Sequence, residues 1–269
     1  MSLSTVFVVT GANKGIGYGI VKVLLRSLSS LSTFTARNDK LGMESLNKVI
    51  KELGNKRHSD IRFHQLDITD PTESPEEQAR VTIGINYDGT KQVCDILFPL
   101  IRDGGRVVNV SSSEGILAGY YSNEIIAKLT SPSLTVADID KFTHDYIKAC
   151  IGDKRKENGF PQSAYKVSKA AEIALTFIQA KELKSRNILV NACHPGFVNT
   201  DMTSHRGPLT IDEGAETPIY LATLKDNGPT GKFFIKKRDR LECSTELRFE
   251  FGGSCIWWRR VLCGRIRDL

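Results

Sequence analysis

The sequence predicts an α/β protein: one domain built on a doubly wound, mostly parallel sheet. The first observation is Val6–Val9, an apolar run without polar alternation, which is typical of a strand buried on both faces of a parallel sheet. The second is a glycine turn at Gly11, Gly15 and Gly17, after which apolar residues recur at helical spacing. The third is that strand-like and helical segments go on alternating along the chain.

The composition is that of a globular protein. The chain has 269 residues, of which 40% are hydrophobic and 25% are charged. Its net charge of +6 comes from scattered basic residues, which argues against nucleic acid as a partner. No apolar run approaches the ~18 residues of a membrane span, and no leader pattern opens the chain, so we expect a cytoplasmic protein. The six cysteines lack metal-ligand spacing and are interpreted as thiols, with no metal site.

The second and third βα steps follow the first helix. Ser32–Ala36 is a weak strand that ends at Arg37, and Met43–Leu53 has helical spacing. Ile61–Leu66 alternates as a strand and ends at Asp67. The first 67 residues therefore have the order βαβαβ.

The rest of the chain continues the pattern, with one long excursion. We expect a long mixed helix over Glu76–Ile101 that contains Asn86, and a strand over Arg106–Ser112 with hydroxyls at its carboxyl end, where ligands bind in such sheets. Gly115–Gly159 has little strand character. The other expected elements are a helix after the capping box of Thr135 and Asp138, a helix over Ser163–Arg186, a strand over Ile188–Cys193, a helix over Ala215–Leu224 after the capping box of Thr210 and Glu213, and a strand over Gly231–Ile235.

Four residues are candidates for acid–base chemistry. Tyr165 and Lys169 are spaced i, i+4, which places a phenol and an ammonium on one helix face. A phenol can donate a proton to a developing alkoxide if a nearby cation favours the phenolate. Ser112 could bind a substrate carbonyl, and Asn86 could hold a water or a helix bend in a proton relay. The alternatives are an exposed helix pair, a turn cap and an ordinary polar helix residue.

The glycine turn is a candidate diphosphate site. Backbone N–H groups at a helix N-terminus bind anions, and glycines let the anion come close. The spacing G-x-x-x-G-x-G departs from the common G-x-G-x-x-G, so a turn with no ligand is the alternative.

Several motifs together resemble the short-chain dehydrogenase/reductase family, and in particular its NADPH-dependent carbonyl reductases. They are TGANKGIG (Thr10–Gly17), TAR (Thr35–Arg37), FHQLDI (Phe63–Ile68), GRVVNVSS (Gly105–Ser112), SAYKVSK (Ser163–Lys169), NACHPGFVNTDM (Asn191–Met202) and EGAETPIYLA (Glu213–Ala222). The similarity spans nearly all of residues 5–237. The long excursion resembles the insert of monomeric carbonyl reductases, so the resemblance implies a Rossmann-type monomer.

The resemblance implies a role for each matched residue in the reduction of ketones, aldehydes or quinones to alcohols. Tyr165 would be the acid, Lys169 would support it, Ser112 would hold the carbonyl, and Asn86 would complete the tetrad. The residues implied in cofactor binding are Gly11, Asn13, Lys14, Gly15, Ile16, Gly17, Arg37, Asp67, Ile68, Tyr165, Lys169, Pro195, Gly196, Val198 and Thr200. The cations Lys14 and Arg37 favour a 2′-phosphate, so the implied cofactor is NADPH.

The chain departs from the family at the centre of the sheet. The family has a further helix and strand before the Asn86 helix, and this chain lacks that unit of ~30 residues. Either the strand ending at Ser112 pairs directly with the first strand, which shifts Ser112 by ~4.8 Å, or the sheet stays open at its centre. A catalytically impaired isoform that binds nucleotide or a partner without turnover is therefore the alternative function.

Residues 238–269 do not resemble the family. This tail has seven arginines, no lysine and both tryptophans of the chain. We expect a reductase domain over residues 1–237 and a poorly ordered tail over 238–269 that promotes aggregation through its aromatic residues.

Overall fold

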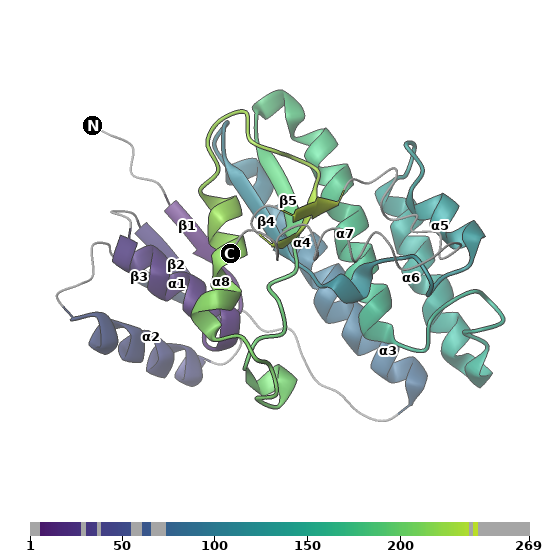
Figure 1. Ribbon diagram of the computed structural model, residues 1–269, viewed down its shortest axis with the longest axis horizontal. Helices are drawn as coiled ribbons and strands as arrows, with labels where there is room; N and C mark the ends of the chain where they lie inside the picture. Colours follow the sequence, from purple (N-terminus) through teal and green to yellow (C-terminus); the bar gives the residue numbers. More distant parts are fainter. Residues whose placement is uncertain are drawn as a thin grey trace, which may run out of the picture.

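The computed structural model describes residues 6–27, 31–36, 39–54, 61–65, 74–236 and 239–241. Strands and helices alternate in its first part. In order they are β1 (Val6–Val9), α1 (Gly15–Ser27), β2 (Leu31–Ala36), α2 (Asp39–Leu53) and β3 (Ile61–Gln65). The three strands form a parallel sheet in the order β1-β2-β3, which confirms the predicted βαβαβ pattern (Figure 1). Arg37, Asp67 and Ile68 lie outside the described residues.

The second part begins with helices and ends with a second sheet. The elements are α3 (Pro75–Ile83), the π-helix η2 (Gly84–Asp88), α4 (Gly89–Leu97), β4 (Arg106–Val110), α5 (Asn123–Leu129), α6 (Val136–Cys150), α7 (Ala164–Glu182), β5 (Leu189–Cys193), α8 (Ile211–Ala222), β6 (Phe233–Lys236) and β7 (Asp239–Leu241). Short 3₁₀ turns are η3 (Phe98–Leu100), η4 (Ser113–Gly115), η5 (Ile151–Asp153), η6 (Lys184–Arg186) and η7 (Asp201–Thr203). The strand order is β4-β5-β6-β7, and only β7 runs antiparallel to its neighbour in this sheet.

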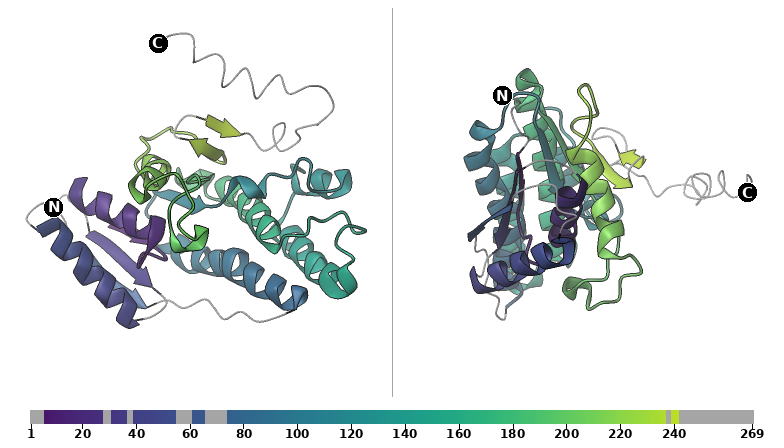
Figure 2. Two further views of the ribbon diagram at one scale, coloured as in Figure 1. Left: turned by 60° about the horizontal axis from the view of Figure 1, so that its bottom comes forward. Right: turned by 90° about the vertical axis from the view of Figure 1, so that its left-hand side faces the viewer.

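Helices cover both faces of the second sheet. Successive side chains on a strand point to opposite faces. Ala192 and Phe233 pack in the cluster that contains α7, whereas the next residues, Cys193 and Phe234, pack against Leu221 of α8. The sheet therefore lies between α7 and α8, and the doubly wound architecture is confirmed. Figure 2 shows the arrangement of the elements from two further sides.

The described strands form two separate sheets. β1 and β4 are members of different sheets, so of the two arrangements expected for the shortened chain, the structure adopts the one with an open centre. On the two strands that flank this centre, Val8 is 48% exposed and Val110 is 37% exposed. The two sheets are connected by α8, which packs against both α1 and β4. At the contact with α1, Ile211 and Ala215 of α8 lie against Gly19.

Both predicted capping boxes are present at helix starts. Thr135 and Asp138 cap α6, and Thr210 and Glu213 cap α8. The excursion between β4 and α7 also contains α5, which the sequence did not predict. α6 packs against α3 and α7, so the excursion lies on the helical face of the domain.

The C-terminal boundary falls within a hairpin. Residues 239–241, which belong to the expected tail, form β7 and pair with β6. Residues 242–269 lie outside the described part, so the low order of the tail stays a prediction. Within the described residues, no helix has the length and apolar character needed to cross a membrane.

Candidate active site

α7 carries the predicted phenol and ammonium. Ser163 caps its N-terminus by accepting a hydrogen bond from the Lys166 N–H at 3.3 Å. The helix is buried from Val167 to Ala180. Lys169 is only 8% exposed, and its Nζ lies 5.5 Å from the centroid of the Tyr165 ring. Lys169 is therefore buried and Tyr165 half-buried, so the two residues do not form an exposed helix pair, the first of the three alternatives.

Two groups hold the Lys169 ammonium. Its Nζ donates to the carboxylate of Glu172 at 2.8 and 3.1 Å and to the Val110 carbonyl at 3.4 Å. Burial raises the pKa of Glu172, and the charge of Lys169 opposes that rise. Glu172 was not predicted from the sequence, because its role depends on the burial of α7.

The end of β4 lies directly on α7. The Ser111 hydroxyl donates to the Lys169 carbonyl at 3.0 Å. Gly115 allows the close approach, because a Cβ there would lie 2.6 Å from the Lys169 carbonyl carbon. Ser112, between them, is 6% exposed and accepts a hydrogen bond from the Glu114 N–H at 3.2 Å as the cap of η4. Ser112 therefore has the capping role named as its alternative, in a position beside the Lys169 segment.

Asn86 lies in the π-helical turn η2. A π-helix accommodates an extra residue and often marks a functional position. The Asn86 amide donates to the Ser168 hydroxyl at 2.9 Å, and that hydroxyl donates to the Tyr165 carbonyl at 2.9 Å. Asn86 is thus bonded to the same turn of α7 that carries Tyr165 and Lys169.

The glycine turn fits a diphosphate. Gly11 and Gly15 have φ of +60° and +55°, which side chains rarely adopt. A Cβ on Gly17 would lie 2.5 Å from the Gly11 carbonyl oxygen, so the turn can close tightly only with glycine there. The turn leads into α1, whose N-terminus favours anions. Asn13, Lys14 and Ile16 belong to the same turn, and Lys14 is exposed.

The loop after β5 meets the glycine turn. It contains the predicted residues Pro195, Gly196, Val198 and Thr200. The Lys14 ammonium lies 3.1 Å from Asp201, and contact with Lys14 lowers the pKa of Asp201. Gly15 faces the Thr200 side chain, which would lie 3.4 Å from a Cβ.

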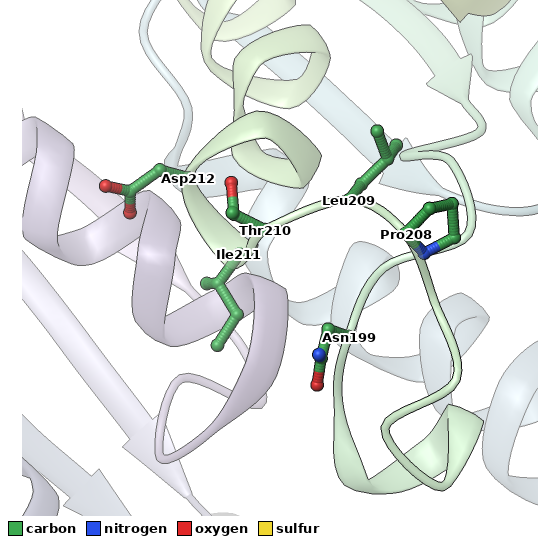
Figure 3. Close-up of a pocket in the computed structure, with 6 residues that line it drawn as sticks. All are labelled: Asn199, Pro208, Leu209, Thr210, Ile211 and Asp212. Atoms are coloured by element: carbon green, nitrogen blue, oxygen red, sulfur yellow. The ribbon is translucent and has the colours of Figure 1, made fainter.

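A pocket of about 400 Å³ lies between this loop and the start of α8. Asn199 lines one side of it, and the segment Pro208–Asp212 lines the other (Figure 3). The isolated bridge between Val198 and Leu209 joins the two arms of the loop. The loop thus brings predicted cofactor residues beside the glycine turn.

A second group of polar residues follows the ends of β4 and β5. Burial lowers the pKa of His194, and the charge of Glu114 opposes this effect. The buried Nδ1 of His194 has no hydrogen-bond partner among the described residues. Lys166 forms an ion pair with Glu114, and its Nζ lies 3.7 Å from the centroid of the Tyr120 ring. None of these residues was predicted, because their proximity depends on how β4, β5 and α7 pack.

The fold and these contacts define an oxidoreductase of one class: the chain belongs to the short-chain dehydrogenase family. The family model described as short chain dehydrogenase matches residues 153–208, which include α7 and the loop after β5.

Within that family, the chain is similar to carbonyl reductases. The chain is 35% identical over 260 residues to carbonyl reductase (NADPH) 3 of Mus musculus, covering 83% of this chain and 92% of the relative. It is 35% identical over 273 residues to carbonyl reductase (NADPH) 1 of Homo sapiens, covering 87% and 96%. The alignment with the mouse relative extends over 260 positions, but 83% of this 269-residue chain is fewer residues than that. Some positions of the mouse relative therefore have no counterpart in this chain, in agreement with a missing strand.

Among solved structures, the chain is similar to two plant reductases. Salutaridine reductase from Papaver somniferum has a TM-score of 0.75 at 30% identity, covering 86% of this chain and 99% of that one. Menthone neomenthol reductase from Mentha piperita has a TM-score of 0.72 at 27% identity, covering 87% and 99%.

Proposed function

We propose that this chain reduces carbonyl compounds to alcohols with NADPH. One observation carries the proposal: Tyr165 and the buried Lys169 share one turn of α7, to which Asn86 and the end of β4 are bonded. Relatives that are named carbonyl reductases (NADPH) support it. They favour the enzyme over the impaired isoform.

Each residue of the proposed tetrad has one task. The Tyr165 hydroxyl donates a proton to the carbonyl oxygen, and Lys169 favours the phenolate that remains. The Ser112 hydroxyl donates a hydrogen bond to the same carbonyl oxygen. Asn86 fixes the π-helical turn against α7 and orders a water path through which Tyr165 regains its proton. NADPH, when bound, supplies the hydride.

The cofactor would be held by the segments that meet at the glycine turn. Gly11, Gly15 and Gly17 would receive the diphosphate at the start of α1. Lys14 and Arg37 would bind the 2′-phosphate, Asp67 would contact the adenine, and Ile68 would line its site. Val198 and Thr200 in the loop after β5 would hold the carboxamide. We propose ketones, aldehydes and quinones as the substrate range.

Two assays on the full chain test this function. NADPH binding is measured by fluorescence, and menadione reduction is then followed as NADPH consumption. We expect both in the parent protein, and binding without turnover in Tyr165→Phe, which lacks the donated proton. Binding without turnover in the parent would favour the impaired isoform instead.

We further propose that the protein is a cytoplasmic monomer. α6 covers the face formed by α3 and α7, and its Asp140 accepts hydrogen bonds from Tyr87 and Lys91 at 2.7 Å each. A face covered in this way is removed from contact with a second copy. Cys94, Cys150 and Cys193 are buried free thiols, which suits a reducing compartment. Light scattering after gel filtration should give a mass near 29.9 kDa.

A further inference from the structure

A buried carboxylate lies beside the proposed catalytic lysine. Glu172 is 4% exposed, and both of its carboxylate oxygens are within 3.1 Å of the Lys169 Nζ. Neither residue can move to solvent without disrupting α7, since the helix is buried around them. A carboxylate is rarely kept in such a place unless it is paired.

The surroundings give Glu172 no other charged partner in the described residues. From β4, the Ser111 hydroxyl and the Val110 carbonyl face the pair. From β5 comes the Cys193 thiol, whose pKa burial raises to about 12, so it is neutral. On α7 itself the neighbouring titratable group is Tyr165, one turn before Lys169. The carboxylate therefore acts on Lys169, and through Lys169 on Tyr165.

We propose that Glu172 is a positioning residue for the reduction: it is the counter-ion that holds the Lys169 ammonium beside Tyr165 and limits how strongly that ammonium favours the phenolate. This inference rests on the proposed function. A lone buried ammonium would favour the phenolate strongly, and a phenolate cannot donate the proton that reduction requires. The carboxylate offsets part of that field and keeps the Tyr165 hydroxyl protonated to higher pH.

The test compares pH profiles of kcat for menadione reduction in three full-chain variants. Glu172→Gln removes the charge and keeps the shape, so the alkaline limb should move to lower pH by about 0.5–1 pH unit. Glu172→Asp keeps the charge and should recover more than half of this shift. Glu182→Gln, an exposed site on the same helix, is the matched control and should leave the profile in place.

A purely structural role gives a different result. Loss of a purely structural residue would lower kcat or the melting temperature at every pH. The alkaline limb of the pH profile would then stay at the same pH as in the parent. A Glu172→Gln profile that superimposes on the parent profile overturns the inference, while the proposed function stands. If the parent chain binds NADPH but does not reduce menadione, both the proposed function and the inference about Glu172 are wrong.

A second measurement, of the melting temperature, does not require activity, so it can be used if Glu172→Gln alone fails to fold. In the Lys169→Met background, the carboxylate has lost its partner, so adding Glu172→Gln should raise the melting temperature. If it lowers the melting temperature instead, Glu172 serves some other group and the inference fails.

Discussion

Under the proposed function, Lys14 would bind the 2′-phosphate of the cofactor, and in the structure it already has a charged partner. Its ammonium lies 3.1 Å from Asp201, and both side chains are 61% exposed. An exposed pair of this kind contributes about 0–1 kcal/mol, because water screens it and both side chains lose freedom. If Lys14 binds the 2′-phosphate as proposed, the phosphate has to compete with Asp201 for the ammonium.

Replacing Asp201 should strengthen binding of the phosphorylated cofactor. In Asp201→Asn the competing charge is absent, so we expect NADPH to bind about 2- to 5-fold more tightly, with NADH unchanged. Fluorescence titrations with both nucleotides measure the two constants. The double variant Lys14→Ala/Asp201→Asn is the control and should lose the gain. Equal tightening for NADH would contradict this interpretation.

Arg37 lies outside the described residues, and its role is a prediction from the sequence. A charge-assisted contact with phosphate is worth about 1.5–3 kcal/mol, so Arg37→Asp should reverse the preference for NADPH over NADH. Dissociation constants for both nucleotides test it. A variant that prefers NADPH as strongly as the parent would show that Arg37 has another role, such as pairing with Asp39.

Some site residues follow from the sequence and others do not. Tyr165 and Lys169 share a helix face because of their spacing alone. The roles of Glu172 and Gly115 could not be predicted, because they depend on burial and on the packing of η4 against α7. A glutamate in a helix is normally exposed, and only the three-dimensional structure shows that this one is not.

At the scale of elements, the capping box of α6 links stability to pH. The Asp138 carboxylate accepts hydrogen bonds from the Thr135 hydroxyl and N–H at 2.6 and 2.9 Å, and these bonds lower its pKa. A carboxylate with a lowered pKa contributes stability that is present above its ordinary pKa and is lost as the pH falls through the lowered value.

Thr135→Ala should therefore destabilise the protein in a pH-dependent way. We expect a loss of about 1 kcal/mol at neutral pH from the missing N-cap, to which the lost carboxylate contact adds. The loss should be smaller at an acid pH below the lowered pKa of Asp138, where the carboxylate is protonated. Chemical denaturation at both pH values measures it. Thr130→Ala, whose hydroxyl donates to the Ile126 carbonyl, serves as the control, and its cost should not depend on pH.

The order of elements could be predicted, but α5 and β7 could not. Asn123–Leu129 is a short helix of seven residues, too few for a clear period. β7 is three residues long and gains its strand conformation by pairing with β6. Elements that depend on a neighbour rather than on their own pattern leave little signal in the sequence.

At the scale of the whole molecule, the open centre exposes a strand valine that a closed sheet would bury, and this should lower the contribution of that valine to the free energy of unfolding. Val8 of β1 is 48% exposed, whereas Val190 of β5 is fully buried. We expect Val8→Ala to cost less than about 1 kcal/mol and Val190→Ala to cost about 2 kcal/mol, because only the second leaves a cavity. Urea denaturation of both variants measures the difference. Equal costs would mean that β1 is covered in solution.

The two sheets are joined by packing rather than by a strand ladder. α8 contacts both α1 and β4, and Ile211 lies where a Cβ on Gly19 would meet it at 2.5 Å. A ladder fixes the spacing of its strands at about 4.8 Å whatever the side chains are. Here the separation between the glycine turn and Ser112 is set by side-chain volume at the seam of α1 and α8. A substitution at this seam, even of one methyl group, would therefore change the distance between the proposed nucleotide site and Ser112.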